Sequence, residues 1–418
     1  TEGSEAHPAD INQNHLDMVT VKTADKDHDF SRDPLSLQVQ DGWLSADRTT
    51  LGADNGVGCA AALAVMTDPE VEHPPLQLLF TVDEETGLGG ALNLDAGMLS
   101  GSVMLNLDTE DWNELYVGCA GGGGWQFARS FSSEALGAEK RAWRATLRGL
   151  SGGHSGIQIH EQLGNAIKLL AEYLREVPGL RLAAIDVGIA HNVIPREGTV
   201  TFACPADSEA LLQDRAGHCL ARWRGYLPDA DAGLELVIEP ADTSSALDEV
   251  DSLRLLDLVA AFPHGAQAYS LAQPADLVDL SINLARLALD DGELFLEASY
   301  RFFNEQQSLP LQQAVLALAR AFDLEVTPDV GYPGWEPDFA SALLAKGVAL
   351  HERLFGFAPA VKAIHAGLEC GILKSKKPDM DILSFGPTIR GAHSPTERLE
   401  IATVTPFWQY LKALLADI

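Results

Sequence analysis

The sequence predicts an α/β protein in which a doubly wound sheet domain is interrupted by an inserted α+β domain. Two observations lead to this fold class. In residues 1–121, and again after residue 333, apolar strand-like segments alternate with helix-like segments, and the strands end at polar or acidic residues. Residues 122–333 instead show amphipathic strands and helices in another order. A length of 418 residues agrees with two domains, because one ordinary core does not extend over so long a chain.

The first segment supplies three elements of the doubly wound sheet. A helix is expected from Asp54 through GVGCAAALAVMTD, and strands are expected at PLQLLFTV (75–82) and SVMLNLD (102–108). Acidic residues close or follow both strands. Ligands of doubly wound sheets gather at the carboxyl ends of the strands, so these acids mark a candidate site.

The four glycines at 121–124 mark a candidate domain boundary, and a turn near 331–334 marks the return to the first domain. We therefore expect one discontinuous domain of residues 1–121 and 334–418 around an insert of residues 122–333. The elements expected after the first boundary are strands at 141–150 and 198–206, a helix at 165–177, two strands joined at the turn 290–292, helices at 312–322 and 339–355, strands at 361–365 and 381–387, and a helix after Pro406.

Composition restricts the function classes. The net charge of −31 comes from 60 acidic and 29 basic residues, so nucleic acids and anionic membrane surfaces would be repelled. The opening TEGSEAHPADINQN is polar and predicts no secretory leader. Five cysteines form no CxxC pair and no even-numbered framework, which favours a reducing cytosol.

Five dispersed residues suggest a metal site. They follow or close strand-like segments, and two imidazoles with three carboxylates can hold two zinc ions if one carboxylate bridges them. They are His15, Asp54, Glu85, Asp108 and His393. Such a pair of ions would lower the pKa of a bridging water and polarise a scissile carbonyl, which suits hydrolysis. Glu84, next to Glu85, could act as the general base, because adjacent acids in different environments can take different roles.

Each of these residues also has a structural interpretation when it is taken alone. His15 in the HxD motif could be a surface histidine, Asp54 an N-cap, and His393 a histidine of a Gly/Pro-rich turn. If His15 and Asp17 share a strand, their side chains point to the same face, so Asp17 could orient an imidazole. The joint order of the residues is a stronger signal than any single match.

The chain resembles metallopeptidase family M20, the co-catalytic zinc aminoacylase and dipeptidase group, and within it the branch that acts on Xaa-His dipeptides. The stretches that carry the resemblance are HLDMV, TLGADNGVGCAAALAV, EETG, NLDTE, YVGCAGG, LRGLSGGHSG, NVIPRE, YPGWEPD, IHAGLECG and SFGPTIRGAHSP. They extend from His15 to Pro395 and cover nearly the whole chain. The resemblance implies a mixed-sheet zinc-peptidase catalytic domain, an insert that serves as lid and dimerisation domain, and a cytoplasmic homodimer.

The resemblance also implies a role for each matching residue. Asp54 would bridge two Zn²⁺ ions (Mn²⁺ or Co²⁺ are alternatives) and would be joined to Asn55 by a cis peptide bond. His15 and Asp108 would share one ion, and Glu85 and His393 the other. Glu84 would be the base, and Asp17 is counted with it among the catalytic residues. The implied substrate contacts are His154, which would stabilise the carbonyl oxygen and often does so in the partner's site, together with Asn192, Arg196 and Glu369.

The chain departs from the family pattern before His15. Only fourteen residues precede this histidine, where family members carry a helix and strands, so we expect either that the amino-terminal part is incomplete or that this edge of the sheet is built differently. The lead-in INQN is polar, and Asn14 stands in place of a glycine. Three functions follow: a dizinc dipeptidase that prefers Xaa-His, an M20 amidohydrolase for an N-acyl amino acid or tripeptide, and an inactive member that acts as a binding protein.

Overall fold

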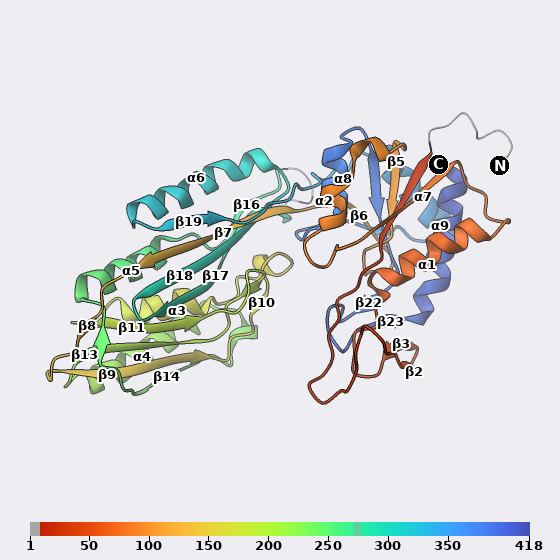
Figure 1. Ribbon diagram of the computed structural model, residues 1–418. Coiled ribbons are helices and arrows are strands. Elements are labelled where there is room, and N and C mark those ends of the chain that lie inside the picture. Colours follow the sequence, from red (N-terminus) through yellow and green to blue (C-terminus); the bar gives the residue numbers. More distant parts are fainter. Residues whose placement is uncertain (1–8, 272–273, 275) are drawn as a thin grey trace. The chain divides into compact units, whose positions relative to one another are not determined.

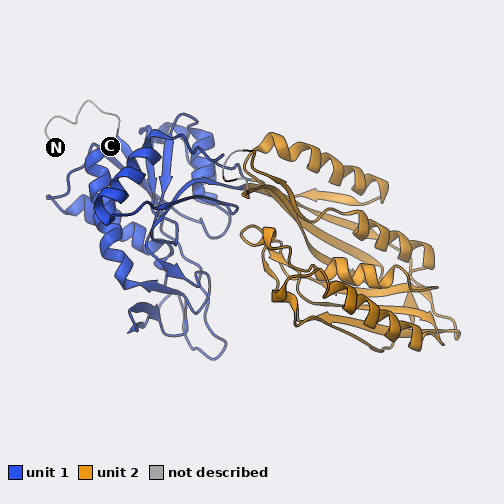
Figure 2. Ribbon diagram, turned by 180° about the vertical axis from the view of Figure 1, so that it is seen from behind, with its two compact units in different colours: residues 1–120, 332–418 blue, residues 121–331 orange. Residues whose placement is uncertain are grey.

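The chain forms two compact units in the computed structural model, which describes residues 9–271, 274 and 276–418 (Figure 2). Unit 1 comprises the chain up to Ala120 together with Tyr332–Ile418, and unit 2 comprises Gly121–Gly331. The chain therefore leaves unit 1, forms all of unit 2 and then returns to complete unit 1.

Unit 1 is built on a mixed six-stranded sheet with the strand order β20-β6-β21-β5-β1-β4. The strands are Ala360–Ile364 (β20), Glu114–Cys119 (β6), Asp381–Ser384 (β21), Val103–Asn106 (β5), Asp10–His15 (β1) and Leu76–Thr81 (β4). The pairs β1–β4, β1–β5, β21–β5 and β20–β6 are parallel, and β21 meets β6 in the antiparallel sense. The carboxyl ends of β1, β4, β5 and β21 consequently meet at one edge of the sheet.

Helices cover both faces of this sheet, as a doubly wound fold requires. Figure 1 shows α2 and α8 on one side of the strands and α1, α7 and α9 on the other. Their bounds are Ala53–Thr67 (α1), Gly89–Asn93 (α2), Ala342–Phe355 (α7), Glu369–Lys376 (α8) and Ile401–Asp417 (α9), with a 3-10 turn at Ala96–Met98. Apolar side chains from the strands and from all five helices form the core of unit 1.

Strand β1 is polar in sequence and yet fully buried. Asn12 and Asn14 are hydrogen-bonded to each other, and Gln13 joins a hydrogen-bonded chain across the sheet. Gln13 Nε2 donates to Thr81 Oγ1 (3.3 Å) and to Glu369 Oε2 (2.5 Å), while Gln13 Oε1 accepts from Asn106 Nδ2 (2.5 Å). Asn106 Oδ1 in turn accepts from Ser384 Oγ (2.5 Å). The chain therefore links β4, β1, β5 and β21 directly below the edge where their carboxyl ends meet.

A small antiparallel sheet with the order β2-β3-β23-β22 adjoins the amino-terminal end of α1. Its strands are Leu37–Gln40 (β2), Trp43–Ala46 (β3), Arg398–Glu400 (β23) and Ile389–Arg390 (β22). The loop between β22 and β23 carries His393, so this sheet holds a carboxyl-terminal loop beside an amino-terminal helix.

Unit 2 is a nine-stranded antiparallel sheet with helices packed on one face. Along each long strand, alternate residues such as Trp143, Phe202 and Leu296 enter a single core together with residues of the four helices. The helices are Ala166–Leu174 (α3), Glu209–Trp223 (α4), Glu249–Ala261 (α5) and Glu305–Ala321 (α6). The sheet strands are Glu235–Pro240 (β14), Lys140–Arg148 (β9), Gly198–Pro205 (β13), Arg181–Val187 (β11), Val278–Asp290 (β17), Glu293–Phe302 (β18), Gly121–Ser130 (β7), Glu325–Pro328 (β19) and Gly265–Tyr269 (β16, which pairs with β17). Short pairs are formed by Gly153–His154 (β10) with Val193–Ile194 (β12) and by Glu134–Ala135 (β8) with Ser245–Ala246 (β15).

The glycine run that suggested a boundary forms the start of β7. These glycines pair with β18, where Gly123 lies opposite Tyr300. A Cβ on Gly123 would come within 2.8 Å of the Tyr300 hydroxyl, so the glycine lets this ring lie against the strand. The Tyr300 ring then stacks on Trp125, with ring centroids 4.6 Å apart.

Most of the expected elements are present with small shifts in their ends, and two helices start earlier than expected. Helix α6 begins at Glu305 and α9 at Ile401, so Pro310 and Pro406 both lie within the second turn. The start predicted for the second of these helices, after Pro406, is therefore too late. Among the described residues, no helix has the length and apolar character needed to cross a membrane.

Candidate metal centre

The five metal-ligand candidates come together at the carboxyl edge of the unit 1 sheet. His15 is the last residue of β1, Glu85 follows β4, and Asp108 follows β5. Asp54 lies in the first turn of α1, and His393 lies in the loop after β22. The doubly wound topology thus unites residues separated by up to 378 positions in the sequence (393 − 15).

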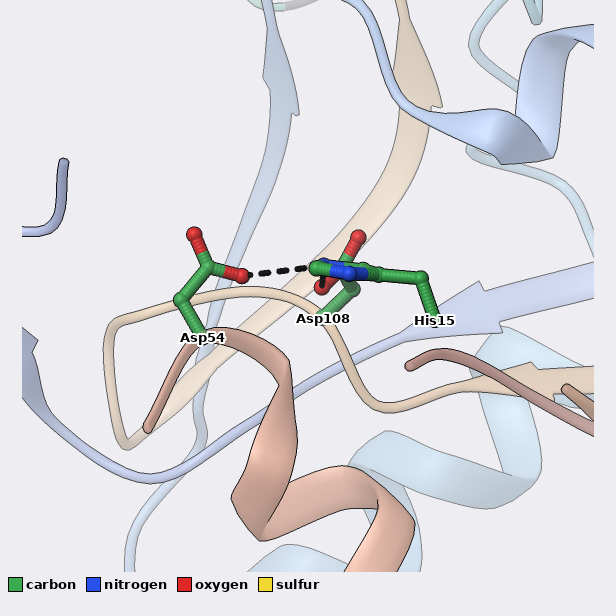
Figure 3. A group of neighbouring side chains, drawn as sticks. All are labelled: His15, Asp54 and Asp108. Atoms are coloured by element: carbon green, nitrogen blue, oxygen red, sulfur yellow. Dashed lines mark hydrogen bonds and ion pairs between the residues drawn. The ribbon is translucent and has the colours of Figure 1, made fainter. Parts of the chain in front are cut away.

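One group consists of His15, Asp54 and Asp108 (Figure 3). His15 Nε2 lies 3.2 Å from Asp54 Oδ1 and 3.1 Å from Asp108 Oδ1. The other ring nitrogen, Nδ1, lies 2.9 Å from the backbone oxygen of Asp17. Because that oxygen can only accept, Nδ1 carries a proton, and in the neutral ring the lone pair of Nε2 is directed at the two carboxylates.

A second group consists of Asp54, Glu85 and His393. His393 Nε2 lies 3.1 Å from Asp54 Oδ2 and 3.1 Å from Glu85 Oε2. Asp54 therefore turns one carboxylate oxygen toward each imidazole, which is the arrangement of a carboxylate that bridges two cations. The Asp54–Asn55 peptide bond is cis, as the resemblance implied.

Glu84 stands beside both groups. Its carboxylate lies in a cluster with His15 and Glu85 whose ligand atoms are all within 4.8 Å of one another. Burial, and next the Asp108 carboxylate, raise the pKa of Glu84 to about 9. Glu84 is therefore a half-buried carboxyl group close to the candidate ligands, which is the position that a group exchanging protons with a metal-bound water would need.

The electrostatics show an excess of negative charge that the imidazoles compensate. Burial lowers the pKa of His15, but hydrogen bonds to Asp108 and Asp54 outweigh it and raise the value to about 12. Hydrogen bonds to Asp54 and Glu85 raise the pKa of His393 to about 11. Burial raises the pKa of Asp108 to about 6. Two carboxyl groups of the cluster, Glu84 and Asp108, thus have pKa values above their ordinary range.

The donor set fits two divalent ions. Two ligands bonded to zinc at about 2.0–2.1 Å with tetrahedral angles are about 3.3 Å apart, close to the 3.1–3.2 Å between the imidazole nitrogens and the carboxylate oxygens. Glu85 Oε1 is buried and has no hydrogen-bond partner among the described residues, so it too has capacity for a cation. The site therefore has ligand types, spacing and free acceptor capacity for a metal pair.

Asp17 holds the backbone of the two glutamates. It lies beyond the end of β1, so the expected same-face relation with His15 on one strand is wrong. Its carboxylate oxygens accept from the backbone N–H groups of Glu84 (3.2 Å) and Glu85 (3.1 Å). Its backbone oxygen contacts the His15 ring, so Asp17 does orient that imidazole, through its carbonyl group.

Three of the four substrate-contact candidates lie together in unit 2. His154 ends β10 and pairs with Val193 of β12, next to Asn192. The side chain of Arg196 lies against the same turn, because a Cβ on Gly152 would come within 2.9 Å of Arg196 Cβ. His154 Nδ1 accepts from the backbone N–H groups of Gly156 and Ile157 (3.1 Å each). This turn therefore fixes the tautomer in which His154 Nε2 carries the proton.

Glu369, the fourth candidate, belongs to unit 1 and is fully buried, so its substrate-binding role stays a prediction. Its Oε1 has no hydrogen-bond partner among the described residues. Glu369 Oε2 accepts from Gln13 Nε2 and Thr81 Oγ1, each at 2.5 Å. Burial raises the pKa of Glu369 to about 7. Glu369 is part of the polar chain below the metal centre.

Two residues of the site were not found by sequence reasoning. Asn55 Nδ2 donates to Asp108 Oδ1 and to the backbone oxygen of Leu107. The carboxylate of Glu397 accepts from the backbone N–H groups around Asp54. In the sequence, Asn55 follows Asp54 and Glu397 lies four residues after His393. These positions suggest a link to the site, but they do not show which groups the two side chains contact.

The comparisons with known proteins agree with this geometry. Residues 12–417 match the model of peptidase family M20/M25/M40. The chain belongs to this family. It is therefore a hydrolase of peptide bonds in an M20 fold, and M20 metallopeptidases bind divalent metals. The M20 chain is 36% identical to the cytosol non-specific dipeptidase of Escherichia coli, over 100% of this chain and 87% of the relative.

Solved structures show the same fold. The crystal structure of aminoacylhistidine dipeptidase from Vibrio alginolyticus superposes with a TM-score of 0.87 at 35% identity, covering 98% of this M20 chain and 84% of that chain. A tripeptidase from Staphylococcus aureus reaches a TM-score of 0.52 at 15% identity over 100% of this chain and 82% of its own, a likeness of fold alone.

Proposed function

We propose that this M20 peptidase is a dizinc dipeptidase that cleaves the amino-terminal residue from small peptides, with a preference for Xaa-His dipeptides. One observation carries the two-metal part of the proposal. The two carboxylate oxygens of Asp54 face different donor pairs, His15 with Asp108 and Glu85 with His393. A single ion would need only one of these pairs.

The bound ions would be held by the five ligands and would supply an acidified water and a polarised carbonyl group. The protein's own part in the proton transfers falls to Glu84. Its carboxylate lies at the edge of the cluster, where it would take the proton of the attacking water at an Oε atom and pass it to the leaving nitrogen. Asp17 would keep Glu84 in place by accepting its backbone N–H.

His154 is proposed to stabilise the carbonyl oxygen of the peptide as negative charge develops on it. The support for this role is its tautomer: Nδ1 accepts two backbone N–H groups, so Nε2 is a donor over the whole range in which the ring is neutral. Asn192 and Arg196 beside it would contact the substrate's polar ends. The histidine would act within its own chain or across a homodimer.

The proposed substrate class rests on the two similar dipeptidases. The Escherichia coli protein is described as a non-specific dipeptidase and the Vibrio alginolyticus protein as an aminoacylhistidine dipeptidase. Both names support dipeptides as the substrates, and they differ in how broad the substrate range is. Hydrolysis of Ala-His, β-Ala-His, Leu-Gly and N-acetyl-Met, each with and without a chelator, tests the proposal. We expect chelator-sensitive cleavage of the dipeptides, fastest for Ala-His.

The other outcomes correspond to the remaining functions. Cleavage of N-acetyl-Met alone would identify an amidohydrolase of another specificity. No cleavage together with fewer than two metal ions per chain would identify a binding protein. The net charge of −31 also supports a role apart from nucleic acids and anionic membranes. We further propose a cytoplasmic location, as the description of the Escherichia coli relative states for that protein.

A further inference from the structure

Glu397 connects the two ends of the metal centre through the backbone. It lies immediately before β23, and its side chain is only 2% exposed. Its Oε2 accepts from the backbone N–H groups of Leu51 (2.6 Å) and Gly52 (3.0 Å). Its Oε1 accepts from those of Ala53 (2.8 Å) and Asp54 (3.3 Å). One buried carboxylate thus holds four consecutive N–H groups that end at the bridging ligand.

Backbone groups at the start of α1 compensate the charge of this carboxylate. A buried carboxylate is costly unless hydrogen bonds or a positive potential compensate it. Here the compensation comes from the four backbone N–H groups of residues 51–54, because Asp54 and Asn55 have non-helical backbone angles and the regular turns of α1 begin only after them. The residue at the cap position, Gly52, has φ 71° and provides no side-chain cap, so the capping group comes from the far end of the chain.

The two ligand residues that Glu397 connects have irregular backbones. Asp54 has φ −82° and ψ 105°, so helical hydrogen bonds do not fix its conformation. His393 has φ 62°, in the left-handed region that residues other than glycine rarely occupy. Two turns lead from it to Glu397, because Ser394 N donates to Gly391 O (3.2 Å) and Glu397 N to Ser394 O (3.0 Å). Such conformations persist only where surrounding contacts determine them.

We infer that Glu397 is a positioning residue that fixes the Asp54 backbone relative to the His393 loop and so preorganises the Asp54–Glu85–His393 group for its metal ion. Glu397 is not among the candidate ligands, and both of its carboxylate oxygens accept from backbone N–H groups, so it would act through the two ligands. The inference rests on the proposed two-metal function and adds to it the residue that sets the spacing of one site.

Metal affinity of Glu397→Gln and Glu397→Asp, measured by chelator competition, tests the inference. Glutamine places an NH₂ group where only acceptors fit, and aspartate keeps the charge but shortens the reach to Asp54. We expect the affinity for one of the two ions to fall about 10–100-fold, the range for groups that orient metal ligands, and the other ion to be less affected. Excess metal should restore kcat without a change in KM. The aspartate variant should lie between glutamine and wild type.

Asp381→Asn is the matched control. Asp381 also accepts a backbone N–H at a helix start, from Leu343 (3.2 Å), but at the opposite end of its strand from the metal centre. The Asp381→Asn substitution should lower the melting temperature without changing the affinity for metal. If Glu397→Gln loses stability as the control does and binds both ions within two-fold of wild type, the residue is only a helix cap and the inference is wrong.

Hydrogen exchange of the metal-free protein separates this inference from the proposed function. In both Glu397 variants, exchange should accelerate together in residues 51–54 and in the 391–397 loop, whereas Asp381→Asn should affect residues 341–344. A wild type that binds no divalent ion would refute the two-metal function, and the exchange result would still decide the role of Glu397. Unchanged exchange in the 391–397 loop of the Glu397 variants would overturn the positioning role of Glu397.

Discussion

Glu84 and Glu85 are adjacent in the chain, but their carboxylates have different surroundings. Glu85 Oε2 lies 3.1 Å from His393 and belongs to the group around Asp54. Glu84 belongs to the cluster with His15, and burial and Asp108 raise its pKa to about 9. The difference in surroundings predicts a difference in function that substitution can measure.

Glu84→Gln should reduce turnover by about 10²–10⁴-fold, because glutamine retains the shape of the side chain but accepts no proton. Metal content, determined by elemental analysis, should stay near that of wild type. Glu85→Gln is the comparison, and it should lose metal together with activity. Full turnover in Glu84→Gln would require another residue to act as the base.

At the residue scale the sequence predicted which side chains meet but not what holds them. Polar and acidic residues at strand ends predicted the metal cluster, because parallel strands bring their carboxyl ends to one edge. The support from Glu397 to Asp54 spans 343 positions and depends on how a carboxyl-terminal loop packs against α1. Glu369 shows the same limit: no local pattern indicates that its side chain bonds to Gln13 and Thr81.

Helix α1 illustrates at the element scale how closely this unit is packed. A Cβ on Gly58 would lie 2.2 Å from Asn14 Oδ1, 2.2 Å from Asn55 Oδ1 and 2.9 Å from the backbone oxygen of Leu107. The helix can approach β1 and β5 only because this position lacks a side chain.

Gly58→Ala should therefore destabilise unit 1, although alanine in a helix is ordinarily favoured over glycine by about 1 kcal/mol. We expect the overlap to outweigh that gain and to lower the free energy of unfolding by about 1–3 kcal/mol, as overpacking does. Gly56→Ala is the control, since Gly56 lies in the same helix and a Cβ added there would have no atom within 4 Å. Urea unfolding of the metal-free variants measures both. Equal stabilisation by the two substitutions would contradict the packing described for α1.

Element prediction succeeded where periodicity was clear and failed where a tertiary partner decides the structure. The helix α1 and the strands β4, β5, β17 and β18 lie where their patterns indicated. Strand β1 has no apolar pattern, because a hydrogen-bonded chain through Gln13 replaces apolar contacts. The small sheet of β2, β3, β22 and β23 consists of strands of two to four residues, too short for a periodic signal.

At the scale of the whole molecule, metal removal should affect the two units unequally. All five proposed ligands belong to unit 1, so bound metal stabilises that unit by mass action, by about 2.7 kcal/mol at a hundred-fold excess over the dissociation constant. Calorimetry with and without a chelator should show one transition that moves to lower temperature and one that does not. A shift of both transitions by the same amount would indicate that the units unfold together.

Mixed dimers test whether His154 acts across an interface. His154→Ala should depress turnover more than it weakens metal binding, because His154 belongs to unit 2, whereas all five proposed metal ligands belong to unit 1. If the histidine serves the partner's site, mixing His154→Ala with Glu84→Gln chains should restore part of the activity, since one site of each mixed dimer is then complete. No recovery in dimers verified as mixed would assign His154 to its own chain or to no catalytic role.

The discontinuity of unit 1 has a consequence for biosynthesis. During translation, the 211 residues of Gly121–Gly331 (331 − 121 + 1) emerge as one continuous stretch and can fold while the ribosome is still at work. The metal centre cannot form then, because β21, His393 and Glu397 come from the final segment of the message. A nascent chain that ends before this segment therefore contains every residue of unit 2 but lacks one metal ligand of unit 1, and any ribosomal product that ends before His393 contains no complete site for the second ion.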